Sequence, residues 1–147
     1  MQACSLLHVE DEDSSACLFR TALDYAGITV SVYRVSDGEQ ALAFLYRVGP
    51  YVTARRPELV VLDLNMPRVD GWTVLLKTRA NDDLQKIPVV VLSTSSRSED
   101  ETRALSLGAR RYVVKPPDFY GLVREVESVL AEFVPNVSRA SRASASD

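Results

Sequence analysis

The residues best suited to chemistry in this sequence each follow a short apolar run. Glu10 and Asp11 follow SLLHV, Asp63 follows ELVVL, Ser93 follows VVVL, and Lys115 follows YVV. If these runs are parallel strands of one sheet, the side chains meet at its carboxyl edge, where open α/β sheets bind their ligands. The spacing therefore predicts one shared site.

The acids at residues 10–13 and Asp63 predict a metal in that site. At one sheet edge they would repel each other and raise each other's pKa values unless a cation lay among them. Oxygen ligands favour a hard ion such as Mg²⁺, which binds few carboxylates and keeps several waters. The sequence therefore indicates Mg²⁺ as the cofactor.

An acidic pocket that also holds a lysine and a hydroxyl suits a phosphoryl group as the reactant. Asp63 would attack phosphorus as a carboxylate nucleophile, while the metal offsets the charge that develops on the oxygens. Lys115 and Ser93 would hold the remaining phosphoryl oxygens. A strand end would keep Asp63 rigid and in line with the donor, which explains why an apolar run ends on an acid.

Five apolar runs alternate with helical patterns and predict the elements that position these side chains. The predicted strands are residues 5–9, 28–35, 58–62, 89–92 and 112–114. The third and fourth runs are unbroken and rich in valine and leucine, as in strands covered on both faces. Repeated strand–helix alternation predicts an α/β fold with a parallel five-stranded sheet between two layers of helices.

Start signals mark several of the predicted helices. Ser36 and Glu39 have the spacing of a capping box, and Asp70 and Asp118 stand where N-caps are expected. The folded domain is predicted to span residues 1–134. Residues 135–147 are rich in serine, alanine and arginine and are predicted to form a disordered tail.

Length and composition fit one globular domain and exclude several classes of protein. The chain has 147 residues, of which 46% are hydrophobic and 25% charged. The net charge of −3 gives no electrostatic reason to expect nucleic acid or a membrane surface as a partner. No apolar run reaches the roughly 18 residues that span a bilayer, and no signal-peptide pattern is present. We therefore expect a cytoplasmic protein in which Cys4 and Cys17 are reduced.

Four motifs together resemble the receiver domain of two-component response regulators. They are VED at 9–11, LDLNMPRVDG at 62–71, IPVVVLS at 87–93 and GARRYVVKP at 108–116. The resemblance covers roughly residues 5–133 and implies a flavodoxin-like, three-layer (βα)5 doubly wound fold with strand order 2-1-3-4-5. The long segment before the third strand and the lack of an output domain in this sequence resemble the single-domain regulators that partner bacterial phytochrome histidine kinases.

The resemblance implies a role for each residue that matches a family motif. Asp63 is the phospho-acceptor, and Glu10 and Asp11 hold Mg²⁺ together with Asp63 and the backbone carbonyl of Asn65. The other implied roles are a switch hydroxyl (Ser93), a phosphate-contacting lysine on a cis bond (Lys115–Pro116) and a rotating aromatic ring (Tyr112).

The resemblance also implies how such a protein signals. A phosphohistidine of a histidine kinase donates to Asp63, Ser93 moves to bind the new oxygens, and Tyr112 fills the vacated space. The face formed by the fourth helix, fifth strand and fifth helix then changes for a partner protein or for dimerisation. The chain would catalyse only its own phosphoryl transfer and slow dephosphorylation.

Three residues depart from the family pattern. Glu10 stands where aspartate is commoner, and this change affects the water shell of the ion. Thr94 follows Ser93, so a shift of the hydroxyl role by one residue stays open. His8 interrupts an apolar strand; we expect it inside the sheet with a hydrogen-bond partner, the alternative being a phosphorelay or metal role.

Other functions remain open at this point. A phosphohydrolase with an aspartyl nucleophile generally needs a second aspartate two residues later, but that position is Asn65, whose amide cannot act as the general acid. A flavin-binding domain would place a phosphate beside residues 10–13, where four acids would repel it. A receiver fold could also act as a phosphorylation-independent scaffold, although the intact set of Asp11, Asp63, Ser93 and Lys115 argues against this. Separately, Asp63 could serve only as a strand-end cap, and Tyr112 could be a core aromatic.

Overall fold

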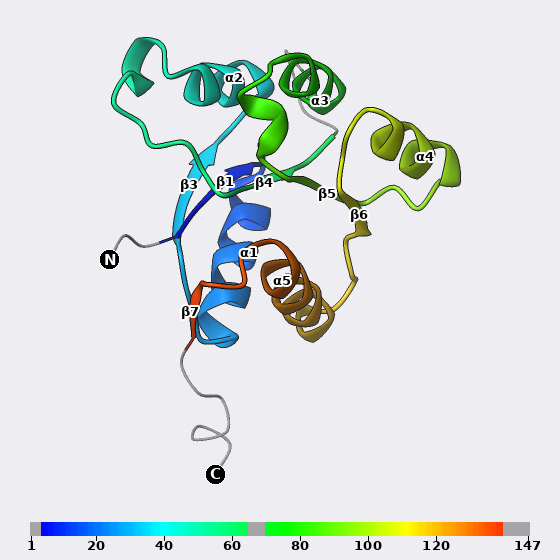
Figure 1. The fold of residues 1–147 in the computed structure, drawn as a ribbon. Coiled ribbons are helices and arrows are strands. Elements are labelled where there is room, and N and C mark those ends of the chain that lie inside the picture. Colours follow the sequence, from blue (N-terminus) through cyan, green and yellow to red (C-terminus); the bar gives the residue numbers. More distant parts are fainter. Residues whose placement is uncertain (1–3, 65–69, 140–147) are drawn as a thin grey trace.

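A five-stranded parallel sheet forms the centre of the structure, a computed structural model that describes residues 4–64 and 70–139 (Figure 1). Its strands lie in the order β3 (Ser31–Val35), β1 (Ser5–Val9), β4 (Leu59–Leu62), β5 (Val89–Ser93) and β6 (Arg111–Val114). Because β3 is the second long strand of the chain, this arrangement confirms the predicted order 2-1-3-4-5.

Helices cover both faces of the sheet, as the alternation of elements predicted. One face carries α1 (Asp13–Tyr25) and α5 (Phe119–Phe133), and the other carries α2 (Gly38–Tyr46), α3 (Gly71–Ala80) and α4 (Ser98–Ser106) (Figure 1). Two short 3-10 helices, η1 (Gly49–Tyr51) and η2 (Leu84–Lys86), precede β4 and β5. The protein is therefore a three-layer α/β structure.

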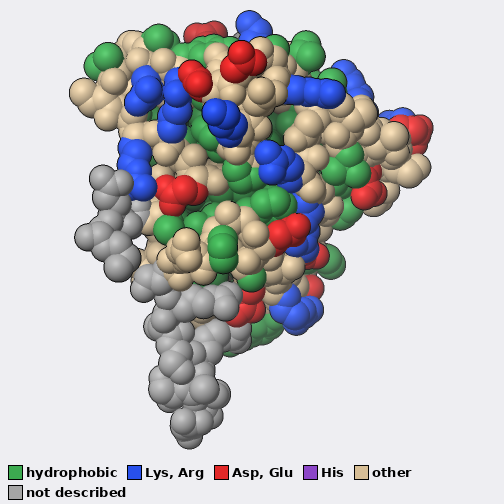
Figure 2. Space-filling view, viewed as in Figure 1, with side chains coloured by type: hydrophobic (Ala, Val, Ile, Leu, Met, Phe, Trp, Pro, Cys, Tyr) green, Lys and Arg blue, Asp and Glu red, His purple; other side chains and the backbone are tan. Residues whose placement is uncertain are grey.

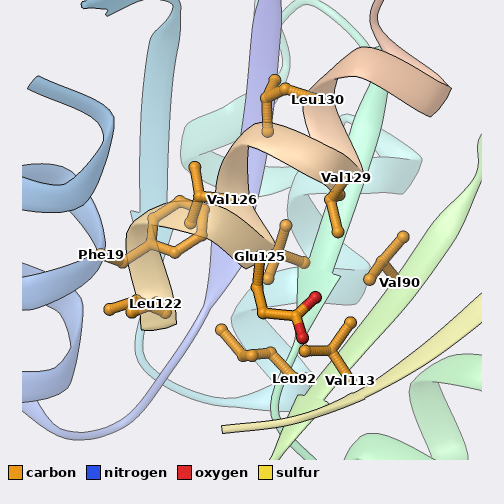
Figure 3. A pocket seen from close by; sticks show the side chains of 10 residues that line it. Phe19, Val90, Leu92, Val113, Leu122, Glu125, Val126, Val129 and Leu130 are labelled. Carbon is orange, nitrogen blue, oxygen red and sulfur yellow. The ribbon is translucent and has the colours of Figure 1, made fainter. Parts of the chain in front are cut away.

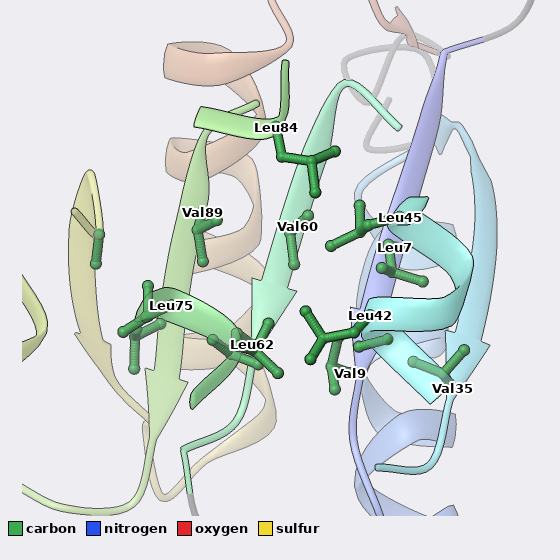
Figure 4. Close-up of a cluster of buried hydrophobic side chains, with 14 of the residues drawn as sticks. Leu7, Val9, Val35, Leu42, Leu45, Val60, Leu62, Leu75, Leu84 and Val89 are labelled. Carbon is green, nitrogen blue, oxygen red and sulfur yellow. The ribbon is translucent and has the colours of Figure 1, made fainter. Parts of the chain in front are cut away.

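Side chains alternate between two cores along each central strand. Leu7 and Val9 of β1 face α2 and α3, as Figure 4 shows, whereas Leu6 packs on the side of α1 and α5. Burying one such side chain stabilises the fold by about 1.5–3 kcal/mol. The same alternation decides from which face of the sheet each polar residue at a strand end projects.

The predicted strand at residues 28–35 is divided in two. Its first part, β2 (Ile28–Thr29), leaves the main sheet and pairs antiparallel with β7 (Ser138–Arg139). The predicted tail therefore includes a short strand near its beginning. The boundary of the folded domain at residue 134 stays a prediction.

Two predicted helix caps are confirmed and one is wrong. Asp70 and Asp118 each accept a hydrogen bond from the backbone amide three residues later, both at 3.0 Å. For α2, Asp37 rather than Ser36 accepts from the amide of Gln40 at 2.8 Å. The Gln40 side chain in turn accepts from the amide of Ser36 at 2.8 Å, which completes a reciprocal cap one residue out of the predicted register.

An apolar pocket lies between α5 and the sheet (Figure 3). Glu125 is the one acidic residue among the residues that line it, and its Oε1 accepts a hydrogen bond from Nη2 of Arg111 at 3.2 Å. The remaining lining side chains, such as Phe19 and Val126, belong to the core between α1, α5 and the sheet. This pocket is therefore part of helix packing and holds no constellation of reactive groups.

Charged side chains of both signs lie on the face of the molecule drawn in Figure 2. On the face in Figure 2, acidic and basic side chains are interspersed without a broad area of one sign. Among the described residues, no helix is both long enough and apolar enough to cross a membrane.

His8 lies inside the sheet, as expected, but without the expected partner for one ring nitrogen. Its side chain is buried, its ring centroid lies 4.2 Å from that of Phe19, and Nδ1 has no hydrogen-bond partner among the described residues. Burial, helped by the charges of Lys115, Arg34 and Arg20, lowers the pKa of His8 to about 3. The imidazole is therefore neutral in the folded protein at neutral pH.

This neutral histidine predicts a loss of stability on mild acidification. In the unfolded chain His8 takes up a proton near its ordinary pKa of 6.5, whereas the folded protein resists protonation down to about 3. Between pH 7 and pH 5 we expect this difference to cost the wild-type protein about 2 kcal/mol. Urea unfolding at both pH values should show a shallower pH dependence for His8→Leu. An equal pH dependence of stability in the wild-type and His8→Leu proteins would show that His8 does not cause the loss.

Candidate functional site

Backbone hydrogen bonds of the sheet continue one residue past three strand ends and fix the reactive residues. The amides of Glu10, Asp63 and Lys115 each donate to a carbonyl of a neighbouring strand, at 3.0, 3.1 and 2.7 Å respectively. The backbone of each of these residues is therefore held in place at the carboxyl edge of the sheet. The strand order places β1 beside β4, so Glu10 and Asp63 are neighbours.

The structure brings the three predicted acids together. One carboxylate oxygen each of Glu10, Asp11 and Asp63 lies within 4.8 Å of the others. The Glu10 side chain is only 1% exposed, while that of Asp63 is 13% exposed. A compact set of carboxylates, of which Asp11 and Asp63 reach solvent, suits a hard divalent cation that keeps some of its waters.

Lys115 lies beside these acids and contacts Glu10 more closely than Asp63. Its Nζ is 2.9 Å from Oε1 of Glu10 and 3.7 Å from Oδ2 of Asp63. The second oxygen of Glu10 accepts a hydrogen bond from the amide of Glu12 at 3.2 Å. The ammonium group therefore supplies the positive charge that the acidic cluster requires.

Burial and pairing act in opposite directions on the pKa values of this ion pair. Burial raises the pKa of Glu10 above its ordinary value, although the hydrogen bond and charge of Lys115 offset part of the rise. For Lys115, burial alone would lower the pKa, but the hydrogen bond to Glu10 and the charges of Glu10 and Asp63 outweigh it and raise the pKa. Lys115 therefore stays charged at neutral pH.

Ser93 and Tyr112 lie on the face of the sheet that α2, α3 and α4 cover. Alternation along β5 places Ser93 on the face of Val89 and Val91, towards α2, α3 and α4, and Tyr112 packs against that same core. Ser93 is fully buried, and its Oγ accepts a hydrogen bond from the amide of Ser95 at 3.1 Å. The hydroxyl of Tyr112 donates to the Ser95 carbonyl at 2.8 Å.

Two further expectations have different outcomes. Asn65, expected to offer a carbonyl to the ion, lies outside the described residues. The predicted cis bond between Lys115 and Pro116 is wrong, because the described residues contain no cis peptide bond.

Arg34 supports the acidic loop and was not singled out from the sequence. Its Nε donates to the carbonyl of Glu10 at 2.9 Å, and its Nη1 lies 2.6 Å from Oδ1 of Asp13. Arg34 is the β3 partner of His8, so the strand register brings it to this loop. An arginine near the carboxyl end of the edge strand, level with His8, was the available signal.

Gly71, the last residue of the motif at 62–71, allows α3 to approach the acceptor strand. A Cβ at this position would lie 2.5 Å from the carbonyl oxygen of Asp63 and 2.6 Å from Cα of Leu64. The Gly71 amide donates to the Leu64 carbonyl at 3.2 Å. The missing side chain therefore helps to set the position of Asp63.

We expect Gly71→Ala to destabilise the protein by about 2 kcal/mol, because backbone atoms must move to admit the methyl group. Urea unfolding measures the effect, with Lys77→Ala, an exposed position of the same helix, as the control. The displaced Asp63 should also react more slowly with a phosphoryl donor. A Gly71→Ala protein as stable as the Lys77→Ala control would refute this close approach.

Comparison with known proteins places the whole described fold in a known class. The sequence model of the response regulator receiver domain family matches residues 6–127. Response regulator Rcp1 of Synechocystis sp. is 36% identical over 132 residues, which cover 88% of this chain and 90% of that protein. The structure of the phosphorylated cyanobacterial phytochrome response regulator RcpA matches with a TM-score of 0.85 and 32% identity, over 95% of this chain and 100% of that one. The Mn²⁺-bound form of Rcp1 matches with a TM-score of 0.82 and 33% identity, over 94% and 99% of the two chains.

Proposed function

Since this chain belongs to the response regulator receiver domain family of two-component signalling, we propose that Asp63 accepts a phosphoryl group from a phosphohistidine of a histidine kinase. The observation that carries the proposal is the partly exposed Asp63 carboxylate, which lies among two other acids and 3.7 Å from the Lys115 ammonium. This set provides a nucleophile with a neighbouring positive charge.

In the proposed reaction, an Asp63 carboxylate oxygen forms a bond to phosphorus. The bond between phosphorus and the kinase imidazole nitrogen breaks, and its electron pair returns to the imidazole ring. Lys115 then pairs with a phosphoryl oxygen, which requires it to share or leave its contact with Glu10. Slow hydrolysis of the resulting acyl phosphate by water would return the protein to its starting state.

Receiver domains bind a divalent metal, and we propose Mg²⁺ for this chain. Glu10, Asp11 and Asp63 would hold it, together with the backbone carbonyl of Asn65. Bound Mg²⁺ would offset the negative charge that develops on the phosphoryl oxygens. The oxygen-only donor set supports a hard ion of this kind over zinc or copper.

The proposed output surface is formed by α4, β6 and α5. Leu105 of α4 and Val114 of β6 are large hydrophobic residues that are 43% and 42% exposed, which supports a role in contacting a partner protein or a second copy. The similarity to phytochrome response regulators supports a phytochrome-type kinase as the donor. A cytoplasmic location and a lack of nucleic-acid binding stay predictions.

Acetyl phosphate tests the proposal directly. With Mg²⁺, intact-mass measurement should show the addition of one phosphoryl group, which hydroxylamine removes because the product is an acyl phosphate. The addition should be absent with EDTA. No addition under any condition would favour a phosphorylation-independent scaffold, and sustained turnover of a phosphate ester would favour a phosphohydrolase.

A further inference from the structure

The sheet holds the backbone of two of the three clustered acids but not that of the third. The amides of Glu10 and Asp63 donate to the carbonyls of Val35 and Val9, at 3.0 and 3.1 Å, and so continue the hydrogen bonds of the sheet. Asp11 lies beyond the end of β1, and among the described residues its amide forms no backbone hydrogen bond. The place of its carboxylate therefore depends on the peptide groups before and after it.

Arg34 holds the peptide group that precedes Asp11. Its Nε donates at 2.9 Å to the carbonyl of Glu10, which belongs to the peptide joining Glu10 to Asp11. On the other side of Asp11, the amide of Glu12 donates to Oε2 of Glu10 at 3.2 Å. Nη1 of Arg34 also lies 2.6 Å from Oδ1 of Asp13, the first residue of α1. One arginine therefore contacts both ends of the turn that carries Asp11.

The edge strand β3 brings Arg34 to this turn. Arg34 is paired in register with His8 of β1, and both side chains line a groove between α1 and β3. The Arg34 side chain is 24% exposed, so most of it lies against the protein. A guanidinium group presents its N–H donors in a rigid plane and can bind two acceptors at once, whereas a lysine ammonium is a point charge on a flexible stem.

We propose that Arg34 is a positioning residue for the metal site, because its bond to the Glu10 carbonyl keeps the Asp11 carboxylate beside that of Asp63. This inference rests on the proposed function, in which the three acids hold Mg²⁺. Arg34 acts through the backbone and is not a ligand. Its positive charge on its own would oppose the binding of a cation. Any gain in metal affinity that Arg34 provides must therefore come from the geometry that it imposes.

Mn²⁺ binding tests this role, since the free ion can be counted by its electron paramagnetic resonance signal. We expect Arg34→Lys to bind Mn²⁺ about fivefold more weakly than wild type, because the charge stays but the paired hydrogen bonds are lost. Arg20→Lys is the matched control. Arg20 donates to the carbonyl of Val32 on the same strand at 3.3 Å, away from the acidic turn, and its replacement should leave Mn²⁺ affinity unchanged.

Two further measurements separate positioning from a general effect on the fold. Labelling of Arg34→Lys by acetyl phosphate should need more Mg²⁺ but reach the wild-type rate at saturation, since Asp63 and Lys115 are unchanged. Urea unfolding in EDTA measures the stability of the same variant without metal. A lower stability with unchanged Mn²⁺ affinity would mean that Arg34 is only structural and would overturn the inference, as would tighter Mn²⁺ binding.

Failure of the proposed function gives a different result. Wild-type protein that binds Mn²⁺ and loses affinity in Arg34→Lys, but accepts no phosphoryl group, would refute the phosphoryl transfer and support the role of Arg34 in the metal site. Wild-type protein that binds no Mn²⁺ would overturn both the metal site and this inference.

Discussion

Replacing Asp63 with asparagine is expected to abolish labelling by acetyl phosphate while leaving the protein folded. The asparagine amide is not nucleophilic enough to form the bond to phosphorus, so no acyl phosphate can arise at this position. Folding should not suffer, because Lys115 keeps its nearer partner Glu10 at 2.9 Å. Removing one of three acids that lie within 4.8 Å of each other also relieves their repulsion.

Intact mass after incubation with acetyl phosphate and Mg²⁺ measures the labelling, and urea unfolding in EDTA measures the stability. We expect no label on Asp63→Asn and a stability equal to wild type or higher by up to about 1 kcal/mol. Asp82→Asn, an exposed acid with the same change in charge, should label normally. A label of one phosphoryl group that persists on Asp63→Asn would show that another residue is the acceptor.

The arrangement of the site was predictable because it follows from the topology of the sheet. Asp63, Glu10 and Lys115 each come directly after an apolar strand, and parallel strands put their carboxyl ends at one edge. The residue types and this rule sufficed to predict that the three side chains meet. The pairing of β2 with β7 was not predictable, because the tail that supplies β7 has a polar composition and no strand pattern.

Finer features depended on distances that the sequence does not contain. The acids and the lysine were expected around Asp63, but the buried Glu10 takes the closer contact with Lys115. The capping box of α2 shifted by one residue, since Asp37 and Gln40 offer the same side-chain spacing as Ser36 and Glu39. Likewise, no local pattern distinguished Ser95, whose amide and carbonyl bond Ser93 and Tyr112.

Replacing Lys115 with methionine should destabilise the metal-free protein by about 3 kcal/mol. The Glu10 carboxylate is only 1% exposed. Among the described residues, Lys115 is the one cation that forms an ion pair with it, so the variant would lose this partner. Burial already raises the pKa of Glu10, so without Lys115 the side chain must either take up a proton or remain an uncompensated charge beside Asp63. Either outcome disfavours the folded state at neutral pH.

Added Mg²⁺ should restore part of this loss. In wild type the ammonium group occupies the acidic cluster and competes with the metal, whereas in Lys115→Met the three carboxylates meet the cation without competition. Stabilisation by a ligand grows with its concentration relative to its dissociation constant, so a titration with Mg²⁺ should raise the stability of Lys115→Met more than that of wild type. Labelling by acetyl phosphate should nevertheless fall, since a phosphoryl oxygen loses its positive partner.

Urea unfolding in EDTA and at increasing Mg²⁺ measures both effects, with Lys86→Met as the control at an exposed lysine. The double variant Lys115→Met with Glu10→Gln completes a thermodynamic cycle. It should cost less than the sum of the two single changes, because neither buried charge is then left alone. Additive losses of stability in the double variant would show that the two side chains contribute independently. An equal response to Mg²⁺ in wild type and Lys115→Met would show that the lysine does not compete with the metal.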